Sequence, residues 1–212
     1  MRTSLLAMIL CASAPAFAGN NEVTIGGTGR SLRTASANAV TSENLGGVQL
    51  GVARQIHLDL VSNLQIWGAL GFESSSAEGE LFGMPTTIDA LDLTFGGNAR
   101  YELHRNLAIV ARLDLGPSKT SLSIEGNGHR VSDARWGMVG SGALGLDLFL
   151  IAYPRFSLGA RFEMGYAMHS ATELSPREGD HGDMLVLPES QASIGGLDLG
   201  GRFYAFSMVS QF

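Results

Sequence analysis

Several residue types are almost absent from this chain of 212 residues. It has one cysteine, Cys11, and one lysine, Lys119, and charged residues make up only 16% of the sequence. The net charge of −6 excludes nucleic-acid binding, because contact with phosphates requires a basic face. Intrinsic disorder is also excluded, because disordered chains are poor in apolar residues, whereas 45% of this chain is hydrophobic.

A long hydrophobic run is missing after the first twenty residues. The longest one, Leu148–Tyr153, is far shorter than the ~20 residues that a transmembrane helix requires. Glycine is abundant instead: the chain has 28 glycines, about twice the usual share of roughly 7%. Such a chain is either a soluble exported domain or a membrane β-barrel. Besides the helix, the closed barrel is the structure that satisfies its backbone hydrogen-bonding groups within lipid.

The first eighteen residues have the order of segments found in a secretory signal peptide. Arg2 supplies the positive start, Leu5–Leu10 an apolar core, and Ala16-Phe17-Ala18 a cleavage site of the A-x-A type. Cleavage there leaves 194 residues with a net charge of −7 and no cysteine. We therefore predict a cleaved signal peptide at 1–18 and one domain at 19–212.

The rest of the chain alternates between apolar and polar residues with a period of two, as in a strand with one apolar face. Phe156, Phe162 and Tyr166, for example, share one face, and Arg161 and Glu163 lie on the other. A helix would spread both classes around its circumference. The pattern predicts eight strands, at 22–33, 44–58, 64–73, 90–103, 107–115, 133–150, 155–169 and 193–212.

Short and long connections alternate strictly between these strands. The short ones lie near 61–63, 104–106 and 152–154, and the longer polar ones at 35–43, 77–87, 125–132 and 171–190. Tight turns on one side and longer loops on the other are typical of an up-and-down barrel that crosses a membrane.

Alternation alone does not tell which face points into the barrel. In a soluble, lipocalin-like carrier of an apolar ligand the apolar face would be inside, whereas in a membrane barrel it faces lipid. The polar faces here are rich in Gly, Ala and Ser, which suit a narrow interior, and their charges have both signs, as buried charges that must pair require. We therefore predict that a charge network fills the lumen, formed by Glu73, Asp92, Arg100, Glu102, Arg112, Asp114, Arg135, Asp147, Arg161, Glu163, Asp198 and Arg202.

The last residues carry a second signal. Tyr204, Phe206, Met208 and Phe212 share one parity, and this ending resembles the C-terminal signal that the barrel assembly machinery reads in bacterial outer-membrane proteins. Upstream, Leu197, Leu199 and Phe203 have the opposite parity. We expect a glycine β-bulge near Gly200-Gly201 to shift the register between the two groups.

Together these features resemble the small eight-stranded outer-membrane barrels, a group that includes the OmpA membrane domain, OmpX and the opacity-type porins. The resemblance covers about residues 20–212 and rests on architecture. It implies an all-β, antiparallel, up-and-down transmembrane barrel in the bacterial outer membrane, with both termini in the periplasm and four long loops outside the cell. An interior of eight strands is only wide enough for side chains, so no wide pore is expected.

Three local motifs raise other functions. His169-Ser170 with Glu173 resembles the H-x-S motif of lipid A deacylases, but adjacent strand residues point to opposite faces. Asp180-His181-Gly182-Asp183 is acidic enough to hold a divalent ion, and Gly26–Gly29 lacks the lysine of a phosphate-binding loop. We expect no catalytic residue, cofactor or metal, and a structural or surface-interaction role with outer-membrane lipid, the assembly machinery and an unidentified extracellular partner. A lipid A-modifying barrel enzyme is the second alternative.

Overall fold

The computed structural model describes residues 20–41, 44–56, 63–81, 83–126, 129–153, 156–174, 177–178 and 196–212, and the predicted signal peptide lies outside them. Besides a short helix, α2 (Ala35–Val40), and three two-residue strands, β8 (Thr172–Glu173), β9 (Arg177–Glu178) and β10 (Gly196–Leu197), this part of the chain consists of long strands. These are β1 (Asn21–Leu32), β2 (Leu45–Ile56), β3 (Leu64–Leu81), β4 (Met84–His104), β5 (Leu107–Gly126), β6 (His129–Tyr153), β7 (Phe156–His169) and β11 (Gly201–Gln211).

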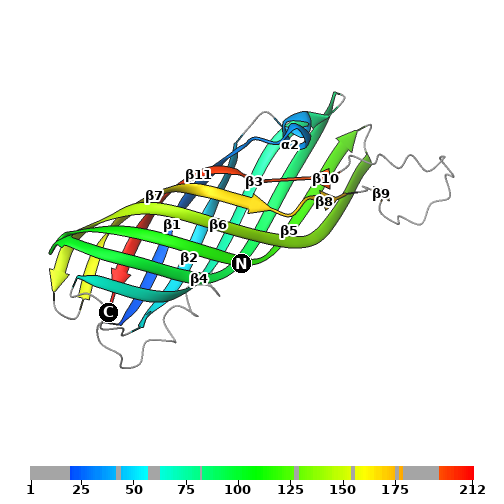
Figure 1. Cartoon of the computed structure of the whole chain (residues 1–212). Helices are drawn as coiled ribbons and strands as arrows, with labels where there is room; N and C mark the ends of the chain where they lie inside the picture. The colour runs from blue at the N-terminus through cyan, green and yellow to red at the C-terminus, as the bar shows by residue number, and fades with distance from the viewer. Residues whose placement is uncertain are drawn as a thin grey trace, which may run out of the picture.

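The eight long strands close into one ring of antiparallel neighbours (Figure 1). Each strand from β1 to β6 pairs with the next one in the chain, and β11 pairs with both β7 and β1. At the seam, Asn21 N donates to Phe212 O and Phe212 N to Asn21 O, both at 3.0 Å. The predicted eight-stranded up-and-down barrel is therefore confirmed.

Side chains alternate between an exposed outer face and a buried inner face along each long strand. On β5, Leu113 is 74% exposed and Val110 only 1%. On β6, Leu148 is half exposed, whereas its neighbour Asp147 is completely buried. Large exposed apolar side chains recur on all eight strands and form a belt around the outside of the barrel. Among the described residues, no helix has the length and hydropathy to cross a membrane.

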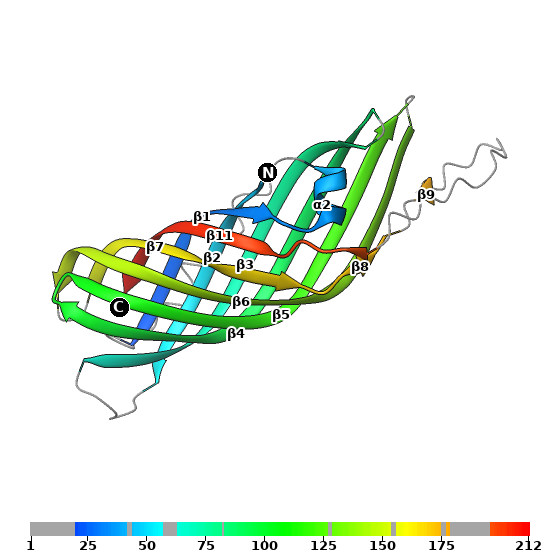
Figure 2. The same ribbon diagram turned by 45° about the horizontal axis from the view of Figure 1, so that its top comes forward.

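The wall of the barrel has two heights (Figures 1 and 2). Strands β3 to β6 contain 18, 21, 20 and 25 residues and extend beyond the other four, which have 11 to 14. The long connections predicted at 77–87 and 125–132 are wrong, because tight hairpins join β3 to β4 and β5 to β6 there. Gly83, with φ of +80°, adopts a left-handed conformation in the first of these turns, which glycine adopts without strain.

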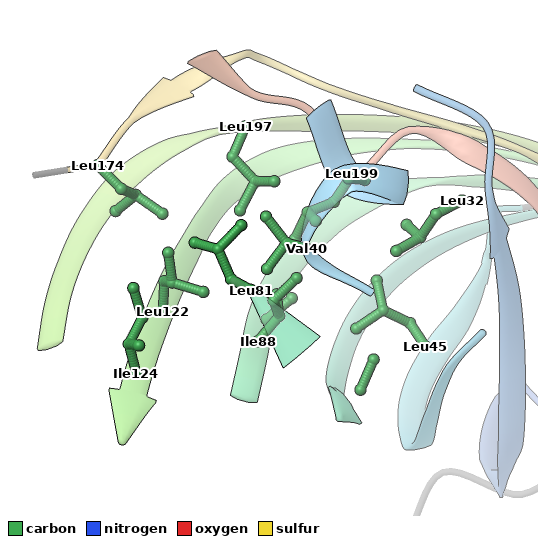
Figure 3. Close-up of a cluster of buried hydrophobic side chains, with 13 residues drawn as sticks. Leu32, Val40, Leu45, Leu81, Ile88, Leu122, Ile124, Leu174, Leu197 and Leu199 are labelled. Carbon is green, nitrogen blue, oxygen red and sulfur yellow. The ribbon is translucent and has the colours of Figure 1, made fainter. Parts of the chain in front are cut away.

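An apolar cluster fills the lumen at this tall end (Figure 3). The predicted connection at 35–43 contains α2, whose Ala37 and Val40 are fully buried. Thr34 caps this helix, since its Oγ1 accepts a hydrogen bond from Ala37 N (3.3 Å) and donates one to Asp198 O (2.6 Å). The cluster comprises Leu32, Ala37, Val40, Leu45, Ala77, Leu81, Ile88, Ala90, Leu122, Ile124, Leu174, Leu197 and Leu199. We call it the apolar plug.

The last strand is shorter and more regular than predicted. β11 begins at Gly201, and its pairing with β1 and β7 runs to Gln211 without a register shift, so the bulge expected at Gly200-Gly201 is absent from this strand. Leu197, Leu199 and Phe203 have the opposite parity to Phe206 because they are buried in the lumen. The sequence pattern changes there because the interior itself is apolar at the tall end.

Candidate functional site in the barrel lumen

Four charged side chains form a closed group in the lower lumen, near Asn21 and Phe212. Arg161 on β7 donates to both oxygens of Asp147 on β6, from Nε to Oδ1 at 2.6 Å and from Nη2 to Oδ2 at 2.9 Å. Its Nη1 lies 2.9 Å from Oε1 of Glu22 on β1. Arg100 on β4 donates to the same two carboxylates, including from Nε to Asp147 Oδ2 at 2.9 Å. We call this the lower cluster; it has two positive and two negative groups.

Aromatic rings cover Arg100 of the lower cluster. Its guanidinium carbon lies 5.1 Å from the ring centre of Trp67 and 5.5 Å from that of Phe149. Both rings are buried, and a cation over an aromatic face is attracted to it more strongly when water is excluded. The lower cluster and its rings connect strands β1, β3, β4, β6 and β7 across the lumen.

A second group lies nearer the tall end, below the apolar plug. Arg30 on β1 donates from Nη2 to Glu73 Oε1 at 2.8 Å and to Asp92 Oδ2 at 3.2 Å, and its Nη1 contacts His169 Nε2. Ser118 Oγ donates to Asp92 Oδ1 at 2.6 Å and lies 3.3 Å from His169 Nδ1. We call this the upper cluster; it connects β1, β3, β4, β5 and β7.

A smaller polar layer separates the two clusters. Arg112 on β5 pairs with Asp114 (Nε to Oδ2, 3.0 Å) and with Glu163 on β7 (Nη1 to Oε2, 3.4 Å), and its guanidinium carbon lies 5.8 Å from the ring centre of Phe203. A cavity of about 60 Å³ opens beside it. Asn98, which lines the cavity, has a buried Oδ1 without a hydrogen-bond partner among the described residues. This is the kind of small polar space in which buried water is stable.

Most of the predicted lumen residues lie inside the barrel or at its mouth. The structure places eight of them in these three layers: Glu73, Asp92, Arg100, Arg112, Asp114, Asp147, Arg161 and Glu163. Asp198 lies half-buried at the mouth, where its Oδ1 accepts from Gly200 N at 2.7 Å.

Three predicted lumen residues lie elsewhere. Arg202 is exposed on the outer face, because β11 has no bulge to turn it inward. Arg135 has the inward parity but is exposed, since β6 rises there beyond the end of β7; its Nε pairs with Asp133 Oδ2 at 3.3 Å. Glu102 is exposed at the opposite rim, where it accepts a hydrogen bond from Gln65 at 2.7 Å.

Glu22, Arg30 and His169 belong to the clusters but were not predicted as lumen residues. The two β1 residues share one parity, and the positions between them, Thr24, Gly26 and Thr28, are small or polar. That face has no apolar alternation of its own, so only the pairing of β1 with its neighbours reveals that it lines the lumen. His169 lies on the same face of β7 as Arg161 and Glu163. This shared parity is the sequence feature that predicts an inward direction for His169.

This distribution contradicts a lipocalin-like carrier. Such a barrel has an apolar interior and a polar exterior, whereas here charged side chains fill the middle and lower lumen and apolar side chains cover the outside. A closed ring of strands with an apolar outer belt is a structure that satisfies its backbone within lipid. The chain is therefore built as a membrane-spanning barrel.

Comparison with known proteins supports this at the level of fold. No protein-family model matches the chain, and no curated protein matches it by sequence. Among solved structures, the outer-membrane protease OmpT of Escherichia coli aligns with 94% of this chain and 99% of its own, at 8% identity and a TM-score of 0.53. Ail of Yersinia pestis, solved with the heparin analogue sucrose octasulfate, aligns with 92% of this chain and 100% of its own, at 10% identity and a TM-score of 0.50.

The chain has the outer-membrane β-barrel fold. This outer-membrane barrel does not bring His169 and Ser170 together. His169 is buried in the upper cluster, whereas Ser170 is exposed and its Oγ accepts a hydrogen bond from Met138 N at 2.8 Å. The nearest hydroxyl partner of His169 is Ser118, which is itself buried beneath the apolar plug and donates to Asp92.

Metal binding has no candidate in the described part of this barrel. No group of three or more His, Cys, Asp or Glu side chains among those residues has the arrangement to hold a metal ion. The acidic segment Asp180-His181-Gly182-Asp183 lies outside the described residues.

Proposed function

We propose that this outer-membrane barrel acts through its tall end, which faces the outside of the cell, as a binding surface and not as a pore or an enzyme. The single observation that supports this most strongly is the occupied lumen. Two charged clusters, the Arg112 layer and the apolar plug succeed one another along the axis, and the cavity between them measures only about 60 Å³. The interior is thus occupied by the protein's own side chains.

The projecting wall supplies the surface for this role. On β3 to β6 above the apolar belt, the outward-facing side chains are mostly polar, and four of them are carboxylates: Glu78, Glu80, Asp89 and Glu125. Lys119 and Arg130 are the outward cations on the same stretch of described residues, and Arg130 already pairs with Glu125 at 3.6 Å. Ail was solved with a heparin analogue, which is a polyanion. The acidic excess on this wall favours a cationic partner instead.

A conductance measurement tests the occupied lumen. Purified protein inserted into planar bilayers should give no conductance step comparable to that of a trimeric diffusion porin. Simultaneous fractionation should recover the chain in the outer-membrane fraction, with heat-modifiable mobility in detergent gels. Large, stable conductance steps would contradict the closed lumen.

A binding measurement tests the surface. Fluorescent decalysine and a fluorescent heparin fragment serve as probes, with the triple variant Glu78→Gln, Glu80→Gln, Asp89→Asn as the test. Decalysine should bind the wild type in a salt-dependent manner and the triple variant much more weakly, because screening and charge removal act on the same attraction. Glu102→Gln removes an exposed carboxylate at the opposite rim and should change nothing. Stronger binding of heparin than of decalysine would reverse the proposed sign of the partner.

The non-enzymatic part of the proposal has its own test. Lipid A extracted from cells with and without this protein should have the same mass spectrum. Loss of an acyl chain that depends on Ser118 or His169 would identify a lipid A-modifying enzyme.

Assembly is the remaining element of the proposal. Tyr204, Phe206 and Met208 are exposed on the outer face of β11, and Phe212 follows its end. We propose that this outward row is read by the barrel assembly machinery. Deleting Phe212 should lower the amount of heat-modifiable protein in the outer membrane, whereas deletion with normal assembly would contradict the role.

A further inference from the structure

Two exposed arginines flank the closing seam at the tall end of the barrel. Arg202 on β11 is directly opposite Ser31 on β1. Arg33 directly follows Leu32, the last residue of β1; it is likewise exposed and has the outward parity of Ser31. Diagonal neighbours on one face are about 7–8 Å apart. The two guanidinium groups can therefore reach a single ligand between them.

The tyrosines around Arg202 mark its depth. Tyr166 on β7 is its cross-strand partner, and Tyr204 is the next outward residue on β11. Both rings are about half exposed on the outer face, and below them come Met164, Phe206 and Met208 of the apolar belt. Tyrosine is enriched where the hydrocarbon ends and the headgroups begin. Arg202 and Arg33 thus lie at headgroup level at the tall end of the barrel.

The outer face of the four strands around these two charges carries no carboxylate at its described positions. The outward-facing described positions of β7, β11, β1 and β2 include Val48, Val52 and Phe162 of the belt but neither Asp nor Glu. Neither Arg33 nor Arg202 forms an ion pair or hydrogen bond with another described residue. Two cations at this separation repel each other. An anion bound from outside would remove that repulsion.

We propose that Arg33 and Arg202 bind a phosphate group of the phosphorylated glycolipid in the outer leaflet. The inference rests on the proposed outer-membrane location and orientation. Each guanidinium presents a planar fork of donors that matches phosphate oxygens, and basic sites beside spanning segments recognise anionic headgroups. Acyl chains of the same lipid would lie along the belt below Tyr166 and Tyr204.

The opposite wall does not repeat this arrangement. Lys119 on β5 faces outward at the upper edge of the belt, opposite Trp136. It is a single cation, and Asp89 projects from the same face one strand away. The site is therefore assigned to the seam and not to a uniform ring of positive charge.

Native mass spectrometry of the detergent-solubilised full chain tests the site, with diphosphoryl lipid A as the probe. The double variant Arg33→Gln, Arg202→Gln should bind the probe at least tenfold more weakly than wild type. Arg130→Gln removes one positive charge, from an arginine that has its own carboxylate partner, and should bind as wild type. Lipid A without phosphates should bind wild type as weakly as diphosphoryl lipid A binds the double variant. Equal binding by the double variant and Arg130→Gln overturns the proposal.

Two further measurements separate the possible failures. Inorganic phosphate in excess should leave the glycolipid bound, because its acyl chains add contacts with the belt; displacement would assign the site to free phosphate and overturn the lipid as its source. Heat-modifiable mobility verifies that each variant is folded. Recovery of wild type outside the outer membrane would instead overturn the proposed location, which the lipid-binding comparison does not measure.

Discussion

Arg161 and Asp147 form a two-pronged pair inside the barrel, with donor–acceptor distances of 2.6 and 2.9 Å. Both side chains are fully enclosed, and each also contacts another member of the lower cluster. Removing one partner of a buried pair leaves a charge without compensation, which costs more than the pair itself contributes. The pair therefore makes the interior intolerant of single charge changes.

The first prediction follows from that imbalance. Arg161→Gln should lower the free energy of unfolding by about 3–5 kcal/mol, because Asp147 and Glu22 lose a shared cation. Arg135→Gln breaks a pair at the open rim, with Arg135 57% exposed, and should cost no more than about 1 kcal/mol. Urea unfolding of the refolded barrel in lipid vesicles measures both. Equal losses would show that burial does not decide the effect.

The second prediction compares two adjacent glycines. A Cβ at Gly47 would lie 2.3 Å from Ser74 O and 2.7 Å from the Ser75 Cα on β3, whereas a Cβ at Gly46 would meet nothing within 4 Å. Gly47→Ala should therefore destabilise the barrel by about 1–3 kcal/mol through overpacking. Gly46→Ala should stay within about 0.5 kcal/mol of wild type. The same urea titration applies, and a Gly46→Ala loss as large as that of Gly47→Ala would contradict the close approach.

The third prediction concerns the belt. Leu113 lies on the outer face between Ile109 and Leu115, in the middle of the apolar stretch of β5. Leu113→Arg should cost about 2–4 kcal/mol, because it places a charge near the bilayer midplane. Thr87→Arg, on the projecting part of β4, should cost little, since that surface contacts water. Urea unfolding of both variants in vesicles of the same lipid measures these losses of stability. A small loss of unfolding free energy for Leu113→Arg would contradict the placement of the belt.

The fourth prediction separates the apolar plug from the barrel beneath it. Val40 is fully buried in α2, so Val40→Asp places an unpaired charge among leucines. Amide exchange should accelerate throughout α2, whereas the strands around the lower cluster should stay protected, because their contacts do not involve the helix. Asn38→Asp changes an exposed position of the same helix and serves as the control. Faster exchange around Arg161 as well would show that plug and barrel unfold together.

Period-two alternation was sufficient to predict the ring, because lipid imposes one apolar face on every strand that crosses it. The same signal vanishes where the lipid ends. Residues 74–80 face water on their outer side, and the sequence there is rich in Ser and Glu, so a projecting hairpin was predicted as a loop.

The lumen was predictable only where its polarity contrasts with the outer belt. Arg161 and Glu163 alternate with Phe162 and Met164, which fixes their direction. Near the plug the interior is apolar as well, so Phe203 and Tyr204 differ in direction but not in hydrophobic character. Arg202 was assigned to the wrong face for this reason, and only the unbroken register of β11 corrects it.

The unequal height of the wall divides the barrel into two sides. The tall strands β3 to β6 form the front, and the shorter strands on either side of the seam, β1 and β11, form the back. Beyond the belt, the eight residues 74–81 of β3 continue for roughly 25 Å along the strand, while β11 begins its pairing at Gly201, just above the belt. A large object approaching from above the membrane meets the front first. A neighbouring protein that diffuses in the plane of the membrane can come closest to the barrel at the back, along β1 and β11. Encounters from above the membrane and encounters within the membrane thus occur on opposite sides of one small barrel.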